Sequence, residues 1–185
     1  MAAETYIALL RGINVSGSNL IKMDALKKSL ETLGFFNIRT YIQSGNIIFQ
    51  SEENSVSTLA QKIREKIQQD FNLQVPAMVK TSEEWNIAVA ENPFLPEYSD
   101  TIENLHLTFL DTMPENSMIE KILPLKNEPD TGVIIGDRIY LYCPEGYGRT
   151  KFTNTYFENK LKVKATTRNW RTMLKLKEMA ATTVR

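Results

Sequence analysis

Two segments in the last third of the chain combine small residues with cations just before predicted helices. Gly146–Lys151 reads GYGRTK and carries Arg149 and Lys151. Thr166–Thr172 reads TTRNWRT and places Arg168 and Asn169 after a threonine, a residue type favoured at helix N-caps. Cations in a first helical turn oppose the helix dipole, and a bound anion would offset that cost. Both segments therefore predict phosphate or carboxylate binding, with a solvated basic turn, or pairing of Arg168 with acidic residues elsewhere, as the alternatives.

Two further polar segments follow strands in the first third of the chain. Arg11–Asn19 reads RGINVSGSN, a loop of small residues whose backbone N–H groups could approach an anion closely. It matches neither the phosphate loop G-x-x-x-x-G-K-[ST] nor the dinucleotide pattern G-x-G-x-x-G. Gln43–Asn46 reads QSGN, and its two amide side chains can both donate and accept hydrogen bonds. An ordinary glycine loop and a well-made turn remain the alternatives for these two segments.

Other residue types that carry chemistry are few. His106 is the only histidine and Cys143 the only cysteine, and we expect both to be structural. A single cysteine excludes an internal disulfide and a cysteine-rich zinc site. No serine lies in a G-x-S-x-G pattern, and no pair of carboxylates has a spacing that suggests acid–base catalysis or a metal site. We therefore predict neither a metal nor a cofactor, and we name no catalytic residue.

Composition narrows the class of protein. The chain has 185 residues, of which 42% are hydrophobic and 24% charged, as in an ordinary globular protein. No apolar run reaches the ~20 residues of a membrane helix, and the start lacks the features of a signal peptide. We therefore expect a cytoplasmic protein with no membrane partner.

The net charge is zero, but residues 82–130 hold 11 acidic and 2 basic residues, whereas residues 138–185 hold 11 basic and 3 acidic. The basic end could attract an anion, or the two blocks could neutralise each other.

The elements that position these segments begin with a β-α-β-β-α-β order in the first half, which is the order of a ferredoxin-like fold. Hydrophobic periodicity predicts strands at 6–15, 38–43, 46–50 and 75–80, and helices at 23–33 and 56–67. Ser55 is the expected cap of the second helix. We assign residues 1–81 to this ferredoxin-like subdomain. Residues 82–101 form a linking helix, opened by a capping box at Thr81–Glu84, and a proline-bounded connector.

Residues 102–185 are predicted to form a second, smaller α+β subdomain with the order β-α-β-β-α-α. Thr112–Glu115 suggests another capping box with proline at the first helical position. The strands are expected at 105–110, 133–135 and 138–142, the last two as a hairpin across Gly136-Asp137. The final helices are expected at 150–161 and 167–181. The whole chain is therefore predicted to be α+β.

The same four polar segments resemble the sequence of an uncharacterised bacterial family known only as a domain of unknown function. The resemblance rests on YIALLRGINVSG at Tyr6–Gly17, RTYIQSGN at Arg39–Asn46, GYGRTKFTN at Gly146–Asn154 and TTRNW at Thr166–Trp170. Ser16 stands where the family usually has glycine. The resemblance implies an α+β fold with a ferredoxin-like part, and it implies no activity, substrate or cofactor.

Our leading hypothesis is a protein that binds an anionic small molecule or nucleotide through its phosphate. The predicted ligand contacts come from all four segments and are Arg11, Asn14, Gln43, Asn46, Arg149, Lys151, Arg168 and Asn169.

Three alternatives stay open. Binding of RNA or single-stranded nucleic acid would use Tyr41 and Phe49 on the hairpin strands together with the basic end, although the zero net charge argues against it. An enzyme could place Asn14, Gln43 and Asn46 around an anionic substrate. A structural homo-oligomer is the third alternative, and the sequence leaves the oligomeric state open.

Overall fold

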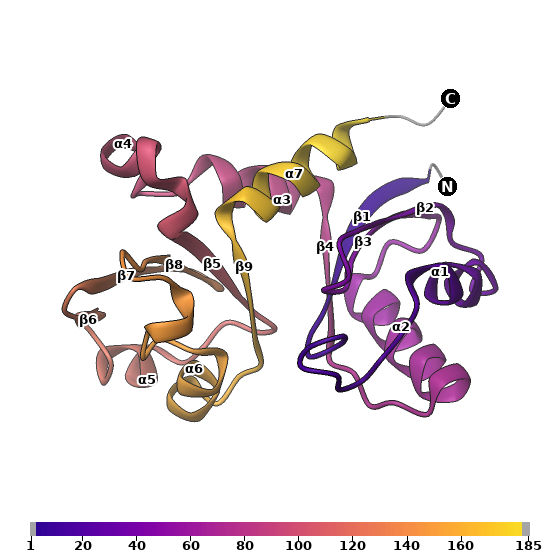
Figure 1. Cartoon of the computed structure of the whole chain (residues 1–185), viewed down its shortest axis with the longest axis horizontal. Helices are drawn as coiled ribbons and strands as arrows, with labels where there is room; N and C mark the ends of the chain where they lie inside the picture. Colours follow the sequence, from indigo (N-terminus) through magenta and orange to yellow (C-terminus); the bar gives the residue numbers. More distant parts are fainter. Residues whose placement is uncertain (1–2, 183–185) are drawn as a thin grey trace. The chain divides into compact units, whose positions relative to one another are not determined.

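The computed structural model describes residues 3–182, and the fold is α+β (Figure 1). Within these residues the chain divides into two compact units, after Ile87 and again after Lys175. The first unit contains residues 3–87 together with 176–182, and the second contains residues 88–175. Each unit has one antiparallel sheet.

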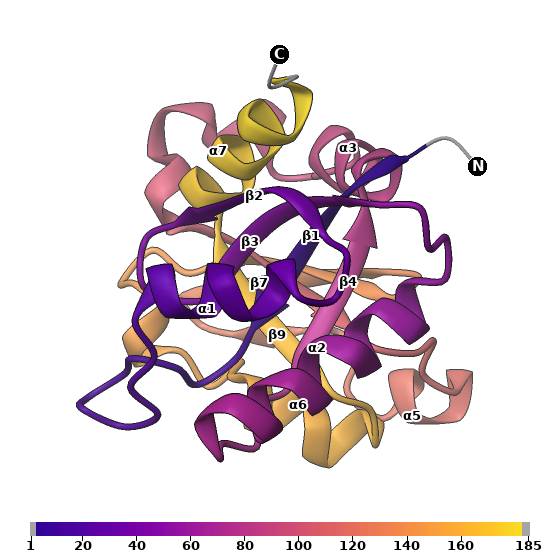
Figure 2. The ribbon, with the colours of Figure 1, turned by 90° about the vertical axis from the view of Figure 1, so that its right-hand side faces the viewer.

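The first unit follows the predicted β-α-β-β-α-β order. Its strands form a sheet in the order β2-β3-β1-β4, and every neighbouring pair is antiparallel. Both helices lie on the same face of this sheet (Figure 2). The elements are β1 (Glu4–Leu10), α1 (Met23–Glu31), β2 (Phe36–Tyr41), β3 (Asn46–Ser51), α2 (Val56–Phe71) and β4 (Ala77–Thr81), followed by α3 (Ser82–Ala90), whose residues from 88 on belong to the second unit.

Alternation along β1 builds the core of the first unit. Tyr6, Ala8 and Leu10 point to the helix-covered face and are fully buried. The Phe49 ring stacks on Tyr6 with 5.6 Å between centroids and on Phe35 with 4.4 Å. Phe49 is therefore a core residue, and the pair of exposed rings on which the nucleic-acid alternative rested is not formed.

Local capping signals in the first unit were predicted correctly. The Ser55 hydroxyl accepts a hydrogen bond from the Thr58 N–H and caps α2. Thr81 and Glu84 form a reciprocal capping box, in which Glu84 N–H donates to Thr81 Oγ1 at 3.0 Å and Thr81 N–H donates to Glu84 Oε2 at 2.8 Å. The first strand is shorter than predicted because Gly12 has φ +73° and turns the chain away from the sheet.

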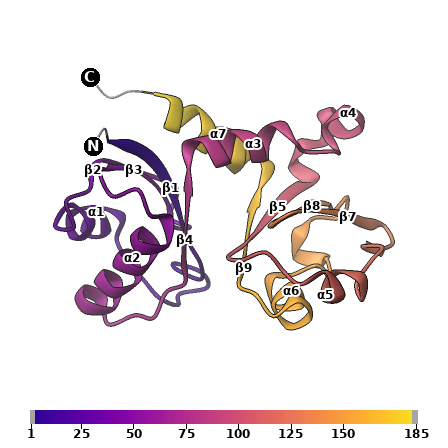
Figure 3. The ribbon, with the colours of Figure 1, turned by 180° about the vertical axis from the view of Figure 1, so that it is seen from behind.

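The second unit has a sheet in the order β6-β7-β8-β5-β9, again antiparallel throughout. Helices α5 and α6 lie on one face of it (Figures 1 and 3). The elements are α4 (Leu95–Tyr98), a 3₁₀ helix (Ser99–Asn104), β5 (Leu105–Leu110), α5 (Asn116–Glu120), β6 (Lys126–Asn127), β7 (Asp130–Ile135), β8 (Arg138–Tyr142), a 3₁₀ turn (Tyr147–Arg149), α6 (Asn154–Leu161), β9 (Ala165–Asn169) and the first part of α7 (Trp170–Ala181), whose residues from 176 on belong to the first unit.

Three predictions for the second half were wrong. Two strands were missed, so the order is not β-α-β-β-α-α: β6 has only two residues, and β9 occupies the start of the predicted last helix. The helix predicted from residue 150 begins at Asn154, because Thr153 rather than Thr150 caps it. The capping box at Thr112–Glu115 is absent, and α5 begins after Glu115 with no side-chain cap. The hairpin across Gly136-Asp137 is confirmed.

Within residues 3–182, none of the helices combines the length and apolar character that a bilayer crossing requires.

Candidate functional site

The first two polar segments meet in the first unit. Leu10 N–H donates to Gly45 O at 2.7 Å, which joins the end of β1 to the turn between β2 and β3. Asn14 Nδ2 donates to Gln43 O at 2.9 Å, and it also donates to Ile21 O at 2.9 Å. Asn14 Oδ1 accepts from the Ile21 N–H. The Asn14 side chain therefore fastens the loop after β1 to the hairpin turn.

Side-chain hydrogen bonds also hold the hairpin turn between β2 and β3 in place. Asn46 is fully buried, and its Nδ2 donates to Tyr41 O at 3.1 Å and to Ser44 Oγ at 2.9 Å. Gly45 has φ +81°, and a Cβ atom there would lie 2.6 Å from Leu10 Cβ. The asparagine amides at this junction thus bind backbone and turn groups, which is a structural use of the residues predicted as ligand contacts. Arg11, Asn14, Gln43 and Asn46 stay predictions as ligand contacts.

The last two polar segments meet in the second unit, on the face of the sheet covered by α6. Cross-strand pairing sets Thr108 opposite Thr167 and His106 opposite Asn169. One step further along the same face, Leu110 lies opposite Ala165 in the apolar core. The face therefore changes from apolar to polar along β5 and β9. We call His106, Thr108, Tyr147, Asn154, Thr167 and Asn169 the polar cluster.

Thr167 is the centre of the polar cluster. Its hydroxyl donates to Asn154 Oδ1 at 2.7 Å and accepts from the Tyr147 hydroxyl at 3.1 Å. Thr108 Oγ1 lies 2.7 Å from Thr167 Oγ1, and Thr108 must be the donor because the single Thr167 proton goes to Asn154. Among the described residues, the Asn154 Nδ2 group has no acceptor, so this network leaves an amide donor available.

His106 lies at the polar end of the cluster and is nearly buried. Its ring stacks on Tyr147 with 5.0 Å between centroids. Burial lowers the pKa of His106 below its ordinary value of 6.5, against the opposing effect of a hydrogen bond to Asn104 O at 3.3 Å. A neutral ring that donates from Nδ1 to Asn104 O presents Nε2 as an acceptor, and Asn169 Nδ2 lies 3.4 Å from it. Asn169 is held in turn by Glu103 O at 2.9 Å.

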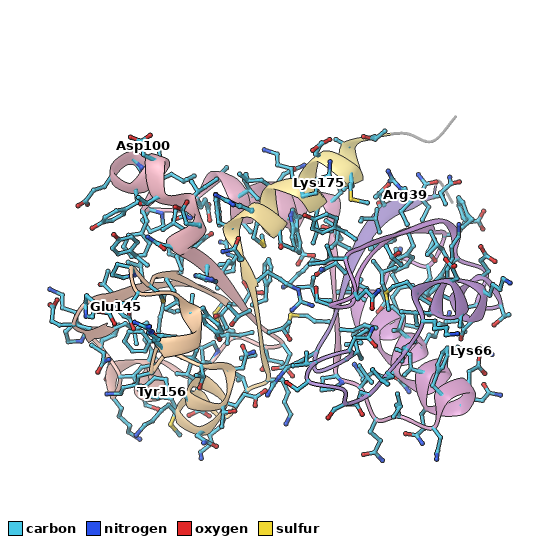
Figure 4. The ribbon with its side chains drawn as sticks, viewed as in Figure 1. Arg39, Lys66, Asp100, Glu145, Tyr156 and Lys175 are labelled. Carbon is cyan, nitrogen blue, oxygen red and sulfur yellow. The ribbon has the colours of Figure 1, made fainter. Side chains whose placement is uncertain are left out.

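The predicted cations do not lie in first helical turns. Arg149 is in the 3₁₀ turn and Lys151 precedes the Thr153 cap, so neither opposes the dipole of α6. The Arg149 side chain is 77% exposed and lies 4.0 Å from Glu145, and Lys151 Nζ lies 5.9 Å from the Tyr156 ring centroid. Figure 4 labels Glu145 and Tyr156, the residues that these two cations approach.

Arg168 is a strand residue rather than a helix residue. It lies in β9 between Thr167 and Asn169, so alternation directs it to the opposite face of the sheet from the polar cluster. Desolvation lowers the pKa of Arg168 to about 10, and its guanidinium stays charged at neutral pH. Arg168 donates to Thr167 O at 3.0 Å.

The polar cluster was not foreseen as such. The sequence prediction included Asn169 and the cations Arg149 and Lys151, but it assigned no binding role to Thr108, Tyr147, Asn154 or Thr167, and it set His106 aside as structural. The available signal was the alternation of His106 and Thr108 on one strand with Thr167 and Asn169 on another. It was hidden because Thr167 and Asn169 were assigned to a helix.

A surface hollow of about 440 Å³ lies in the first unit, at the start of α3. Its lining includes Glu4 and Glu83 and none of the predicted ligand contacts. Two carboxylates make this hollow a poor match for the predicted anionic ligand.

Comparison with known proteins adds a family and a fold. The family described as "Protein of unknown function (DUF1697)" matches residues 3–140. No curated protein matches the chain. A solved structure described as the conserved bacterial protein SP0830 from Streptococcus pneumoniae is similar, with a TM-score of 0.71, 24% sequence identity, and coverage of 97% of this chain and 99% of that one. That likeness shows a shared fold, and the family match shows that this chain is a member of the DUF1697 family, whose function is uncharacterised.

Proposed function

We propose that the second unit binds an anionic small molecule, such as the phosphate of a nucleotide, beside the polar cluster. Asn154 Nδ2 would donate to the anion, and Arg149 and Lys151, which come from the same short segment, would supply positive charge. The single observation that supports this is the donor left available on Asn154 by the network around Thr167.

The chemistry of the cluster favours a ligand over a purely structural role. Thr108 and Thr167 lie on the same face of the sheet as the apolar pair Leu110 and Ala165 and next to it. Apolar side chains at the two threonine positions would therefore pack without needing hydrogen bonds. A buried polar network stabilises a fold no better than apolar residues of the same shape, and sometimes less well. What it provides is a fixed direction for each donor. A donor of fixed direction, in the same short segment as two exposed cations, is suited to an anion.

A thermal-shift experiment tests the proposal. The wild-type protein is heated with AMP, ATP, ribose 5-phosphate and inorganic phosphate in turn, and at least one of them is expected to raise the melting temperature. The double variant R149A/K151A should lose that rise. The double variant K160A/K164A removes the same charge from exposed positions of the same unit and should keep it.

Two results would contradict the proposal. One is that no phosphate compound stabilises the wild-type protein. The other is that both double variants lose the stabilisation equally, because the effect would then come from net charge and not from the segment 146–154.

A further inference from the structure

A patch of three aromatic side chains lies on the second unit, apart from the polar cluster. Tyr98 from α4 and Tyr142 from the end of β8 stack with 3.8 Å between centroids and 19° between planes. Phe94 packs beside both, at 6.1 Å from Tyr98 and 6.4 Å from Tyr142. Each of the three is only partly buried, so the patch has an accessible side. We call Phe94, Tyr98 and Tyr142 the aromatic patch.

The stretch of chain that carries Phe94 and Tyr98 is acidic. Residues 88–104 contain four carboxylates and neither lysine nor arginine. Two of the four have cationic partners. Glu91 Oε2 lies 2.6 Å from Arg138 Nη2, and Glu103 Oε2 lies 3.6 Å from Arg171 Nη2.

The other two, Glu97 and Asp100, are exposed next to Tyr98. The neighbouring Glu97 carboxylate raises the pKa of the Tyr98 phenol, which stays neutral at physiological pH. Among the described residues, Asp100 has no cationic partner, and Figure 4 shows its side chain pointing away from the ribbon.

Charge decides which occupant fits this surface. Exposed aromatic rings can stack a nucleobase, but the phosphates of a nucleic acid would then lie against Glu97 and Asp100. A cation gains both from the negative face of an aromatic ring and from the carboxylates. Arginine fits better than lysine because its planar guanidinium stacks flat on a ring while its N–H groups reach a carboxylate.

We propose that the aromatic patch, with Glu97 and Asp100, is a docking surface for an arginine-bearing segment of a partner protein. The partner's guanidinium stacks on the exposed face of the Tyr98–Tyr142 pair and donates hydrogen bonds to Asp100. This interaction goes beyond the proposed anion binding, uses none of the same residues, and stands or fails independently of it.

Fluorescence polarisation with a labelled glycine–arginine repeat peptide tests the surface on the full-length protein. The peptide is expected to bind more tightly than the matched glycine–lysine peptide, and a glycine–glutamate peptide should not bind. Tyr98→Ala should raise the Kd by about three- to tenfold, as loss of a cation–π contact predicts. Tyr98→Phe keeps the ring and should bind within about twofold of wild type, because only the hydroxyl is lost.

The charge contribution is measured separately, so that the test does not depend on Tyr98→Ala folding. Asp100→Asn should weaken arginine-peptide binding, and Glu120→Gln, an exposed carboxylate on α5, should not. The proposal is overturned if the arginine and lysine peptides bind equally. It is also overturned if Asp100→Asn and Glu120→Gln have the same effect, or if oligothymidylate binds to the patch in place of the peptide.

Discussion

In the first unit, the side-chain amides of Asn14 and Asn46 donate hydrogen bonds to backbone and turn oxygens. In the second unit, by contrast, polar side chains hydrogen-bond to one another, since Thr167 contacts both Thr108 and Asn154. Both units cover one face of an antiparallel sheet with helices, so their architecture does not explain the difference. Polar groups that bind backbone fix the path of a loop. Polar groups that bind each other inside a core contribute little net stability, but they hold donors in a defined direction. The second unit is therefore the better place to look for a ligand.

The largest effect is expected at the junction of the first unit. Gly45→Ala places a Cβ atom 2.6 Å from Leu10 Cβ and does so at φ +81°. The clash and the backbone strain together should lower the free energy of unfolding by about 3 kcal/mol or more. Gly17→Ala is the matched control, because its φ is +77° but no atom lies within 4 Å of the new Cβ. Urea denaturation should show a loss of only about 1–2 kcal/mol for the control. Equal losses would mean that the close approach at Gly45 is unimportant.

Thr167→Val should be the most damaging conservative change in the polar cluster. It leaves the hydroxyls of Thr108 and Tyr147 and the Oδ1 atom of Asn154 without their common partner. Polar groups left without a hydrogen-bond partner in a partly buried site should lower the free energy of unfolding by about 2–3 kcal/mol. Thr131→Val removes a single hydrogen bond of 3.4 Å from a strand of the same unit and should cost well under half as much. If the two variants unfold at the same urea concentration, the network is not cooperative.

Asn14→Gly measures the backbone-directed use of asparagine in the first unit. The substitution removes three hydrogen bonds to Ile21 and Gln43, although glycine relieves the strain at φ +54°. We expect a net loss of about 1–2 kcal/mol. Asn72→Gly is an ideal control, since Asn72 also has φ +54° but forms only an exposed side-chain hydrogen bond to Gln68. A loss at position 72 as large as that at position 14 would contradict the anchoring role of Asn14.

The smallest effect concerns pH. Because the folded state lowers the pKa of His106, the unfolded chain takes up a proton more readily than the native one. Stability should therefore be unaffected above the ordinary pKa of 6.5 and should decline as the pH falls below it. His106 is the only histidine, so a proton NMR titration reads it without assignment, and its midpoint should lie below 6.5. A midpoint at or above 6.5 would show that the ring is not desolvated. His106→Gln should remove part of the stability loss between neutral and mildly acidic pH.

Much of the first unit could be predicted because its signals are local and agree with one another. The spacing of Leu26 and Leu30, the serine before α2 and the Thr81–Glu84 box each indicate one structure only. The second half contains residues that fit two structures. Threonine favours both helix caps and strands, so Thr166-Thr167 suggested a helix start where β9 forms.

The candidate site depended on that same ambiguity. Thr108 and Thr167 are 59 residues apart, and only the pairing of β5 with β9 brings them together. No local pattern records such a pairing, because it depends on which strands become neighbours in the sheet. The segments that carry the site were nevertheless recognised as unusual, since Gly146–Asn154 and Thr166–Trp170 supply Tyr147, Asn154, Thr167 and Asn169.

Helix α6, which carries Asn154, ends at a residue that offers a practical advantage. Lys162 has φ +59° and donates its N–H to Glu158 O, a position for which glycine is the preferred residue. Lys162→Gly should therefore raise the free energy of unfolding by about 0.5–1 kcal/mol without altering any side chain of the polar cluster. A background of this kind would keep weakened site variants folded long enough to be screened for ligands.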